Sequence, residues 1–491
     1  MNDSMIIMAI MVPFLWGLGI LIVPEFKNRK TLLFVSGLGL VVAAILGGLV
    51  VFGGEIELML FSLGENMNIF FRIDDISRLF ACVVTVVWVL AGFYAFEYMK
   101  HEREEKRYFG FYNMVFGILF ALVFSGNLIT FYLFYEMMTL LSLPLVLHSK
   151  TKEAIMGGLK YLFYSLFGAY MVLFGIYFLN KYASTLDFAA GGTLDMGLVQ
   201  GNESLLLVVA FAMIVGFSVK AGMFPLHAWL PTAHPVAPAP ASAVMSGIIV
   251  KMGVLGMIRV VYYIIGADFI RGTWVQTTWM VLALITVFMG SMLAYREKIL
   301  KKRLAYSTVS QISYILFGMA LLQPQALTGS LLHVVFHAAI KSVLFLCAGA
   351  IIYKTGKTSV EDLKGIGKEM PVTIWCYTFA AAALIGIPPA SGFISKWHLA
   401  LGSLASGIEV FSWLGPVVLL ISALLTAGYL LPITVNGFLP GEDYVCDSQE
   451  KKEPVKAMLI PVMILAVISI MLGVLPGRLT AFISGIVSTL L

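Results

Sequence analysis

Residues 220–253 read KAGMFPLHAWLPTAHPVAPAPASAVMSGIIVKMG, and this stretch constrains the path of the chain more than any other. Lys220 and Lys251 lie in apolar surroundings near its two ends, and the residues between them are rich in proline. Proline lacks the backbone N–H donor and breaks a helix, so one helix cannot run through the whole stretch. Irregular backbone is tolerated at membrane depth only where protein or a water-filled cavity satisfies its polar groups. We therefore expect an interrupted membrane helix that folds back before the next crossing begins.

The chain as a whole has the composition of a membrane protein. Its 491 residues are 60% apolar and 12% charged, and the mean hydropathy is +0.94. Soluble globular domains carry about 25% charged residues, so this composition excludes an ordinary soluble enzyme. Little of the chain is left for a domain outside the bilayer, and any chemistry must therefore take place within it.

No cofactor is expected in this chain. Its cysteines stand singly, without the paired spacing that iron–sulfur clusters and zinc sites need, and we interpret them as small apolar packing residues. A phosphate-binding glycine loop and a hydrolase nucleophile motif are both missing from the sequence. ATP-driven transport and hydrolysis are therefore poorly supported. The cysteines are Cys82, Cys347, Cys376 and Cys446.

Fourteen apolar segments are long enough to cross the hydrocarbon core as helices, which predicts an all-α polytopic membrane protein. The first segment has no basic flank and no small-residue cleavage site, so we expect a retained helix and not a signal peptide. The predicted segments are 5–23, 31–53, 76–99, 109–125, 127–147, 155–180, 204–226, 241–265, 274–295, 304–322, 328–353, 372–404, 412–438 and 455–475.

The distribution of basic residues predicts the orientation of these segments. The odd-numbered loops hold 21 Lys and Arg residues, whereas the even-numbered loops and the C-terminus hold only Arg72, Lys181, Arg271 and Arg478. Short cytoplasmic loops carry the excess of positive charge. We therefore expect both termini on the non-cytoplasmic side of the membrane.

Apart from Lys456, which we count with the loop that precedes it, seven basic residues fall inside the predicted segments. Two of them, Arg78 and Arg259, lie near helix ends, and we expect their long side chains to reach the membrane surface. Lys160 is also close enough to an end to do so. The seven are Arg78, Lys160, Lys220, Lys251, Arg259, Lys341 and Lys396.

Five ionisable residues lie too deep in their segments for their charged groups to reach the membrane surface. Each is disfavoured in the membrane by about 2.5 to 3.5 kcal/mol, so internal partners and a hydrated path are expected. One alternative is a static buried pair of the single acid with one lysine, but one acid cannot neutralise four lysines. A lysine whose charge is marginal is suited to carry protons. The five are Glu136, Lys220, Lys251, Lys341 and Lys396.

A row of titratable residues follows one face of a helix. His333, His337 and Lys341 stand four residues apart, which places them on the same side over about two turns. Imidazole both accepts and donates protons near neutral pH, so the row predicts a proton relay. Buried histidines that merely pack in the core are one alternative, and a metal site is a weaker one because no acid or cysteine stands nearby.

A second interrupted segment resembles the first. Residues 386–396 read GIPPASGFISK, so proline and glycine again stand beside a deep lysine. Interrupted helices in corresponding halves indicate a transporter built from inverted repeats, with the ion path at the breaks. The histidines of the first break, His227 and His234, can admit protons at the cytoplasmic mouth.

These motifs together resemble a known family. Residues 220–253, FYEMMTLLSLP (134–144), HAAIKSVLFLCAG (337–349) and PPASGFISKW (388–397) are similar to the antiporter-like subunits of respiratory complex I, Mrp-type multisubunit Na⁺/H⁺ antiporters and membrane-bound hydrogenases. The resemblance covers nearly the whole chain. It implies fourteen helices, of which the seventh and twelfth are broken. The implied parts are three N-terminal helices (1–108), two inverted five-helix repeats that each form a half-channel (109–265 and 274–438), and a C-terminal helix (455–491).

The resemblance also implies roles for the deep residues. Glu136 and Lys220 match the family's glutamate–lysine pair, and Lys251 matches a bridging lysine. Lys396 matches the terminal lysine of the broken twelfth helix, where some complex I members carry glutamate, and this favours the D-type subunit of Mrp antiporters. The other matches are Lys160 in the sixth helix and the connection formed by His333, His337 and Lys341. We expect neither the lateral helix of the distal complex I subunit nor the additional crossings of the large A-type Mrp subunit.

The sequence thus predicts a proton-translocating subunit of a multisubunit membrane complex, most similar to the D-type subunit of a Mrp-type Na⁺/H⁺ antiporter. The alternative is the same module in a hydrogenase or complex I relative driven by redox partners; catalysis by this chain alone, or a scaffold without transport, is disfavoured. Expected partners are other hydrophobic subunits, the lipid bilayer, H⁺ and, through the complex, Na⁺, but no nucleic acid. The expected location is a prokaryotic-type cell membrane.

Overall fold

Short polar residues begin several of the helices. The side chains of Asn28, Asp74, Asn127 and Thr151 each accept a hydrogen bond from a backbone N–H in the first turn of the following helix. Such caps satisfy N–H groups that have no partner within the helix.

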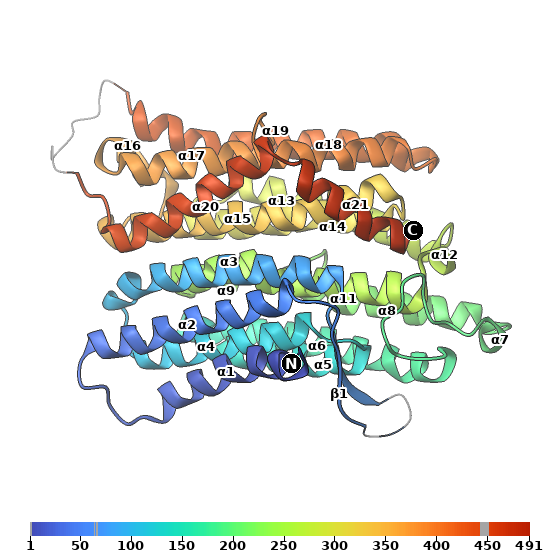
Figure 1. Cartoon of the computed structure of the whole chain (residues 1–491). Coiled ribbons are helices and arrows are strands. Elements are labelled where there is room, and N and C mark those ends of the chain that lie inside the picture. Colours follow the sequence, from blue (N-terminus) through green and yellow to red (C-terminus); the bar gives the residue numbers. More distant parts are fainter. Residues whose placement is uncertain (1, 63, 65–66, 442–450) are drawn as a thin grey trace.

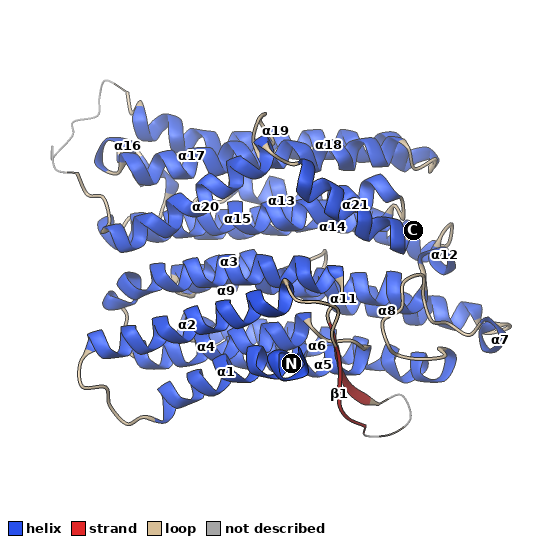
Figure 2. Ribbon diagram, in the orientation of Figure 1, coloured by secondary structure: helices blue, strands red, loops and turns tan. Residues whose placement is uncertain are grey.

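The computed structural model describes residues 2–62, 64, 67–441 and 451–491, and nearly all of its elements are helices (Figure 2).

The chain is a polytopic membrane protein. Within its described residues, 11 helical segments are long and apolar enough to cross a membrane, and they run side by side (Figure 1). They are α1 (Asn2–Ile22), α2 (Arg29–Val51), α3 (Asp75–Tyr98) with η1 (Met99–His101), α5 (Leu128–Val146), α6 (Lys152–Tyr182), α8 (Glu203–Ala221), the segment Ala239–Ile265, α13 (Trp274–Arg296), α15 (Pro324–Thr355), α19 (Glu409–Phe438) and α20 (Lys456–Val474).

Other helices complete the predicted segments. Every segment expected from the sequence contains at least one helix, although the number of fourteen crossings stays a prediction. The segment Ala239–Ile265 consists of α10 (Ala239–Val244), the π-helix η2 (Met245–Ile249), α11 (Val250–Ile258) and the π-helix η3 (Arg259–Ile265). The remaining helices are α4 (Glu105–Val123), α7 (Met196–Val199), α9 (Leu230–Val236), α12 (Ala267–Ile270), α14 (Leu300–Ala320), η4 (Val360–Leu363), α16 (Ile366–Glu369), α17 (Pro371–Ile385), α18 (Ser391–Leu404) and α21 (Gly477–Leu490).

Both helix interruptions occur where the sequence predicts them. Gly222 follows the last residue of α8 and Gly386 follows the last residue of α17, with φ of +80° and +95°, a backbone conformation that favours glycine. The backbone groups freed at the first break find side-chain partners. The Trp229 indole donates to the Val219 carbonyl at 2.8 Å, and the Phe224 N–H donates to Thr286 Oγ1 at 2.9 Å.

The sequence predicts neither a β-hairpin nor a helix after α20. Strands β1 (Glu57–Ser62) and β2 (Asn68–Arg72) form an antiparallel hairpin, so the expectation of an entirely helical chain is wrong for this segment. The second is α21, a short helix that follows α20, whereas one helix was expected in residues 455–491. The length of apolar segments reveals neither element, because neither is long enough to cross a bilayer.

The expectation that Arg259 reaches the membrane surface is wrong. This side chain is 1% exposed and donates to Asp74 Oδ1 at 2.8 Å and to Ser77 Oγ at 3.0 Å. Burial by itself raises the pKa of Asp74, but the charge and hydrogen bonds of Arg259 outweigh it and lower the pKa to about 2. A carboxylate from the start of α3 therefore neutralises Arg259, and no partner of this kind is visible in the local sequence.

Arg78, by contrast, stays partly exposed and pairs with Asp75 at 3.0 Å, as its position near a helix end predicts.

The described cysteines agree with a packing role in part: Cys347 and Cys376 are buried and Cys82 is half-buried. Cys446 lies outside the described residues.

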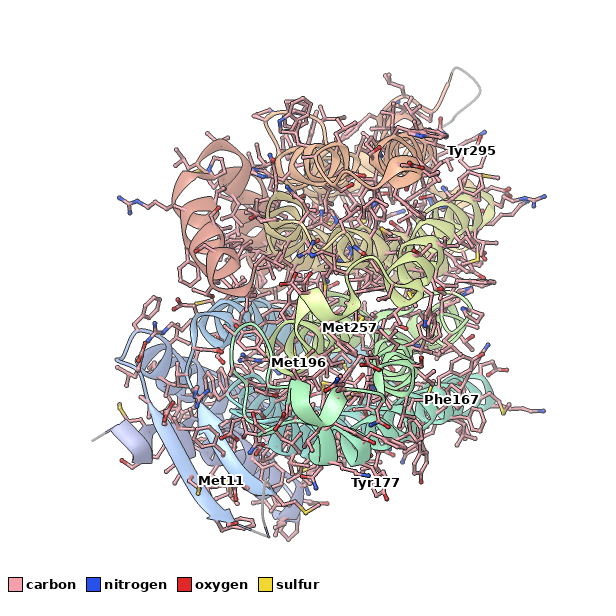
Figure 3. The ribbon with its side chains drawn as sticks, turned by 90° about the vertical axis from the view of Figure 1, so that its right-hand side faces the viewer. Met11, Phe167, Tyr177, Met196, Met257 and Tyr295 are labelled. Carbon is pink, nitrogen blue, oxygen red and sulfur yellow. The ribbon has the colours of Figure 1, made fainter. Side chains whose placement is uncertain are left out.

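The side chains divide into an interior and a periphery. In the view along the helices, Met257 lies inside the molecule, whereas Phe167, Tyr177 and Tyr295 project from its rim (Figure 3). Met257 is fully buried and the three aromatic side chains are exposed. Large apolar side chains on the rim are those that the hydrocarbon of a membrane covers.

Helices α6 and α8 approach each other at two glycines. A Cβ atom on Gly216 would lie 2.6 Å from the Gly168 carbonyl oxygen, and one on Gly168 would lie 2.5 Å from the Gly216 carbonyl oxygen. Small residues let the backbones of membrane helices come close. This contact brings the last turn of α8, and Lys220 with it, against α6.

We predict that Gly216→Leu destabilises the protein by about 1 to 3 kcal/mol or more, because the added side chain must push α6 and α8 apart. The measurement is the melting temperature of the purified protein in mild detergent. Gly48→Leu is the matched control, since a Cβ atom at Gly48 would meet nothing within 4 Å. An unchanged melting temperature for Gly216→Leu would contradict the close contact.

Candidate functional site

Lys220 lies in a cage of hydroxyl groups. Its side chain is 1% exposed at the end of α8. Lys220 Nζ donates to Thr139 Oγ1 at 2.7 Å, to Ser165 Oγ at 2.9 Å and to the Tyr161 hydroxyl at 3.2 Å. The same nitrogen lies 4.6 Å from the centre of the Tyr161 ring, within the range of a cation–π contact. All three N–H groups of an ammonium ion thus have a neutral acceptor, without a carboxylate.

Glu136 lies on α5, one turn before Thr139, and is half-buried. Its carboxylate interacts electrostatically with Lys220. Within the described residues, however, no ion pair or hydrogen bond joins the two, and Glu136 Oε1 is buried without a hydrogen-bond partner. The alternative of a static buried pair is therefore not formed in this structure.

Lys251 has two acceptors that come from different parts of the chain. Its Nζ donates to the Ser246 carbonyl at 2.6 Å and lies 2.7 Å from His337 Nδ1. Ser246 belongs to the π-helix η2, whose wider turn alters the regular pattern of backbone hydrogen bonds just before Lys251. The fully buried Lys341 donates instead to the Leu304 carbonyl of α14 at 3.1 Å.

The histidines of α15 continue this path. The ring centres of His337 and His333 are 5.7 Å apart, and both side chains are fully buried. His333 Nδ1 lies 2.8 Å from Ser395 Oγ on α18, the residue that precedes Lys396. Lys251, His337, His333, Ser395 and Lys396 therefore follow one another through the interior.

The terminal lysine of this row sits at the second helix break. Lys396 Nζ donates to the carbonyls of Leu384 at 2.6 Å and Ile385 at 3.0 Å, the last residues of α17. It also lies 4.9 Å from the centre of the Tyr314 ring. The carbonyls at a helix C-terminus carry partial negative charge and stabilise a cation there.

The predicted residues thus fall into two groups. In the described part of the chain, no hydrogen bond links the Lys220 cage to Lys251. Lys160 is half-buried and donates to Thr232 Oγ1 of α9 at 3.2 Å. His227 is half-buried and lies near the Phe224 ring, whereas His234 is fully buried.

Several residues of the site are not evident from the sequence. The spacing of Tyr161 and Ser165, four residues apart on α6, is a signal that could have found them, as is the position of Ser395 beside Lys396. Gln311 of α14 is fully buried, and neither of its side-chain amide atoms has a hydrogen-bond partner. Lys301 falls in a basic stretch that predicts a loop, but it is only 6% exposed. Its sequence neighbours give no sign of this because segments distant in the sequence cover it.

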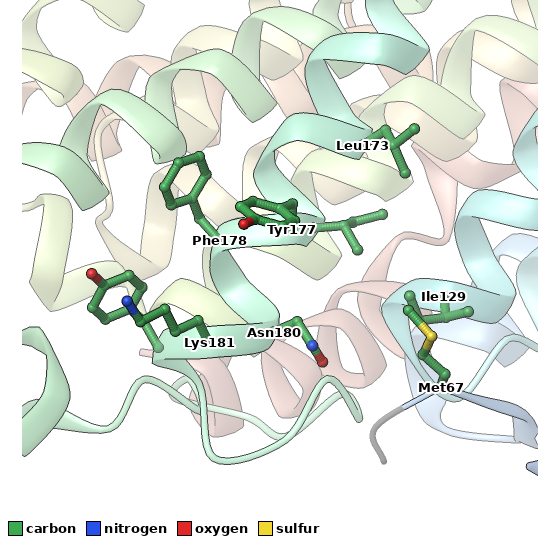
Figure 4. A pocket seen from close by; sticks show the side chains of 9 residues that line it. Met67, Ile129, Leu173, Tyr177, Phe178, Asn180 and Lys181 are labelled. Carbon is green, nitrogen blue, oxygen red and sulfur yellow. The ribbon is translucent and has the colours of Figure 1, made fainter. Parts of the chain in front are cut away.

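A surface pocket of about 450 Å³ lies near the end of α6, apart from this row of lysines, and includes Asn180 and Lys181 in its lining (Figure 4). None of the deep lysines or histidines lines it. Among the residues that the structure describes, no three His, Cys, Asp or Glu side chains gather as a metal site.

The chain belongs to the family described as NADH:quinone oxidoreductase/Mrp antiporter, which matches residues 125–426. Residues 61–109 match a second family, described as the N-terminus of chain 5 of NADH-ubiquinone oxidoreductase, or complex I. These matches confirm the resemblance that the lysine-bearing motifs indicated.

Curated relatives are similar over most of this chain. It is 32% identical over 415 residues to the N subunit of NADH-quinone oxidoreductase of Desulforudis audaxviator, which covers 82% of this chain and 81% of the relative. It is 30% identical over 431 residues to hydrogenase-4 component B of Escherichia coli, covering 83% of this chain and 63% of the relative. With the D subunit of the Na⁺/H⁺ antiporter of Bacillus subtilis it shares 27% identity over 501 residues, covering 100% of this chain and 97% of the relative.

A solved structure shares the fold. One chain of the Mrp complex from Dietzia sp. DQ12-45-1b matches with a TM-score of 0.84 at 22% identity, covering 100% of this chain and 97% of that chain. The chain is therefore an antiporter-like membrane protein by family and by fold.

The unpaired nitrogens of the histidine row lead to a prediction. His333 Nε2 and His337 Nε2 are buried and have no hydrogen-bond partner in the protein. Because buried polar atoms are nearly always hydrogen-bonded, we predict ordered water beside both nitrogens. A cryo-electron microscopy map of the assembled complex, at a resolution that shows water, tests this. The Tyr262 hydroxyl, which already donates to the Met319 carbonyl at 2.8 Å, is the internal control. A map that shows no water density beside either histidine nitrogen would contradict a hydrated path.

Proposed function

We propose that this chain moves protons as the D-type subunit of a Mrp-type Na⁺/H⁺ antiporter. The observation that carries the proposal is the row that runs from the buried Lys251 through the buried His337 and His333 to the half-buried Lys396. A protein that only needed to pack in the membrane would place apolar residues at these depths for less free energy. A role in proton exchange explains why ionisable residues stand at these positions instead.

The proposed mechanism uses electrostatic coupling. A proton reaches Lys220 from the cytoplasm and passes to Lys251, then along the α15 residues His337, His333 and Lys341 to Lys396 and the other side. A carboxylate near an ammonium ion favours the protonated form, and its withdrawal favours release. The separation of Glu136 from Lys220, with hydroxyl groups in place of an ion pair, supports a carboxylate that moves between two positions.

The chain divides into the proposed parts around its two breaks. We assign three helices to 1–108, the inverted repeats to 109–265 and 274–438, and the C-terminal part to 455–491. This makes fourteen crossings when α8 with α9 and α17 with α18 each count as one broken crossing. The support is the correspondence of the breaks: each has a glycine at positive φ, a further helix after it and a deep lysine beside it.

We propose a prokaryotic-type cell membrane with both termini on the non-cytoplasmic side. The distribution of basic residues supports this orientation. In Figure 1, α16, which follows a loop rich in lysine, lies at the opposite end of the molecule from α7 and α12.

Partner subunits are expected to cover the membrane-facing side of α5. Glu136 is half-buried there and has a carboxylate oxygen without a partner. Hydrocarbon cannot solvate such a group, so another protein surface is the better neighbour. Relatives that belong to multisubunit complexes support this expectation.

The second candidate is the same proton path within a redox-driven complex. Hydrogenase-4 component B and the N subunit of NADH-quinone oxidoreductase are both relatives of this chain. We propose that the chain itself holds no cofactor, so redox chemistry would belong to other subunits. Protons are favoured over sodium in this path because its deep groups are amines and imidazoles, and sodium prefers clustered oxygen ligands.

We predict that Lys220→Ala and Glu136→Ala each reduce transport to the background of vesicles without the complex, because the pair sets the proton affinity of the path. The measurement is Na⁺/H⁺ exchange in inverted membrane vesicles, with assembly checked by purification of the intact complex. Lys181→Ala, at an exposed lysine near a surface pocket, is the control and should transport normally. Near-normal exchange in either variant of the pair would overturn the proposed relay.

A further inference from the structure

Two surface pockets meet at Arg78, in the first turn of α3. The first pocket, of about 460 Å³, is lined by apolar side chains apart from Arg78 itself, and we call it the apolar pocket. The second, of about 430 Å³, is lined mainly by charged side chains, and we call it the polar pocket. Arg78 lines both pockets. An apolar compartment joined to a charged one at the end of a membrane helix suits an amphipathic ligand.

The apolar pocket lies between the end of α2, the first turns of α3 and the short helix α21. Its lining includes Leu79 and Cys82 of α3, and Leu479 and Phe482 of α21. Cys82 lies one turn beyond Arg78, about 6 Å further along α3 at the rise of 1.5 Å per residue. The pocket therefore extends from Arg78 toward the interior of the membrane, which is the direction in which the acyl chain of a lipid runs.

The polar pocket contains one carboxylate that no arginine neutralises. Three of its four acidic side chains each pair with an arginine. These pairs are Arg72 with Glu57 at 2.7 Å, Arg259 with Asp74 at 2.8 Å and Arg78 with Asp75 at 3.0 Å. The fourth, Glu55, is exposed and forms no ion pair with any residue that the structure describes. The pocket thus offers a single carboxylate to a cation.

Arg78 keeps donors that the protein does not use. Its Nη1 donates to Asp75, and its Nη2 donates to the Gly53 carbonyl at 3.4 Å, whereas Nε is buried without a hydrogen-bond partner. Only 25% of the side chain is exposed. A guanidinium group has five N–H donors in a fork that matches the oxygens of a phosphate. Arg78 can therefore bind a phosphate and keep its pair with Asp75.

We propose that the two pockets bind one phospholipid with a zwitterionic headgroup of the phosphatidylethanolamine type. An acyl chain fills the apolar pocket, the phosphate accepts hydrogen bonds from Arg78, and the ammonium group donates to Glu55. An anionic lipid without an amine, such as phosphatidylglycerol, would leave Glu55 unpaired near the phosphate. A choline headgroup has no N–H to donate. The site is separate from the lysine row, and the proposal does not depend on proton transport.

The charged groups distinguish a lipid from another occupant of the apolar pocket. An apolar side chain of a partner subunit would fill the space beside Leu79 and Cys82 equally well. It would make no use of the free donor of Arg78 or of the unpaired Glu55. Dependence of binding on the headgroup is therefore the property that the proposal predicts and that simple apolar filling does not.

The test is native mass spectrometry of the intact complex in mild detergent, after removal of lipid and addition of phosphatidylethanolamine and phosphatidylglycerol in equal amounts. We expect the unsubstituted complex to retain phosphatidylethanolamine in preference. Arg78→Gln should weaken its binding about tenfold, as expected for the loss of a charge-assisted hydrogen bond. Arg271→Gln is the matched control, since Arg271 also pairs with an aspartate three residues before it and lines neither pocket. Unchanged binding in Arg78→Gln would overturn the proposal.

Glu55→Gln tests the headgroup separately. The amide keeps the shape of the side chain and removes the charge that attracts the ammonium group. We expect this variant to lose the preference for phosphatidylethanolamine over phosphatidylglycerol, because the remaining contacts are common to both lipids. A preference as strong as that of the unsubstituted complex would overturn the assignment of Glu55 and of the zwitterionic headgroup.

Leu479→Trp tests the apolar pocket without changing a charge. The larger side chain occupies the space proposed for the acyl chain, so we expect it to reduce binding of both lipids. Leu475→Trp is its control, since Leu475 is exposed and lines neither pocket. A cryo-electron microscopy map of the complex gives an independent readout. Side chains of another subunit in the apolar pocket, in place of lipid density that reaches Arg78, would overturn the proposal.

Discussion

The structure depends on how charged side chains are held where lipid cannot solvate them. Lys251 illustrates the solution, since its ammonium group lies between the Ser246 carbonyl and His337 Nδ1, at 2.6 and 2.7 Å. Lys220 uses three hydroxyl groups, and Lys396 uses the carbonyls at the end of α17. Each cation is stabilised by neutral acceptors and not by a fixed counter-ion. Because no fixed carboxylate requires the positive charge, each amine can release its proton, as a proton carrier must.

The irregular backbone follows from the same constraint. The breaks after α8 and α17 and the π-helix before Lys251 all expose carbonyl groups that a continuous α-helix would use internally. Lys396 and Lys251 donate to such carbonyls directly. Helix irregularity and buried charge therefore support each other energetically. By contrast, Arg259 is paired with the carboxylate of Asp74. Breaking this pair would leave an unpaired charge in the interior, which is energetically costly.

Much of this architecture could be predicted from the sequence. The length of apolar segments located the helices, and proline beside glycine located both breaks. The four-residue spacing of His333 and His337 predicted their common face. These are local signals, and they depend on periodicity and on the chemistry of single residues.

Contacts between distant segments could not be predicted. Arg259 and Asp74 are 185 residues apart, so their pairing leaves no trace near Arg259. The basic neighbours of Lys301 indicate a loop, although α9 and the residue that follows it cover the side chain. The hydroxyl groups around Lys220 come from α5 and α6, and serine and threonine are too common in membrane helices to mark a site without the fold. The hairpin of β1 and β2 gives no signal of this kind because its strands are short.

Proton passage along the buried row is tested most directly by proton flux through the complete complex in proteoliposomes when Lys251, the residue that joins α11 to the histidines of α15, is replaced by methionine. The variant and the unsubstituted complex would be compared at equal amounts of assembled protein under the same membrane potential. We expect flux to fall to the level of protein-free vesicles. Flux equal to that of the unsubstituted complex would show that protons do not pass Lys251.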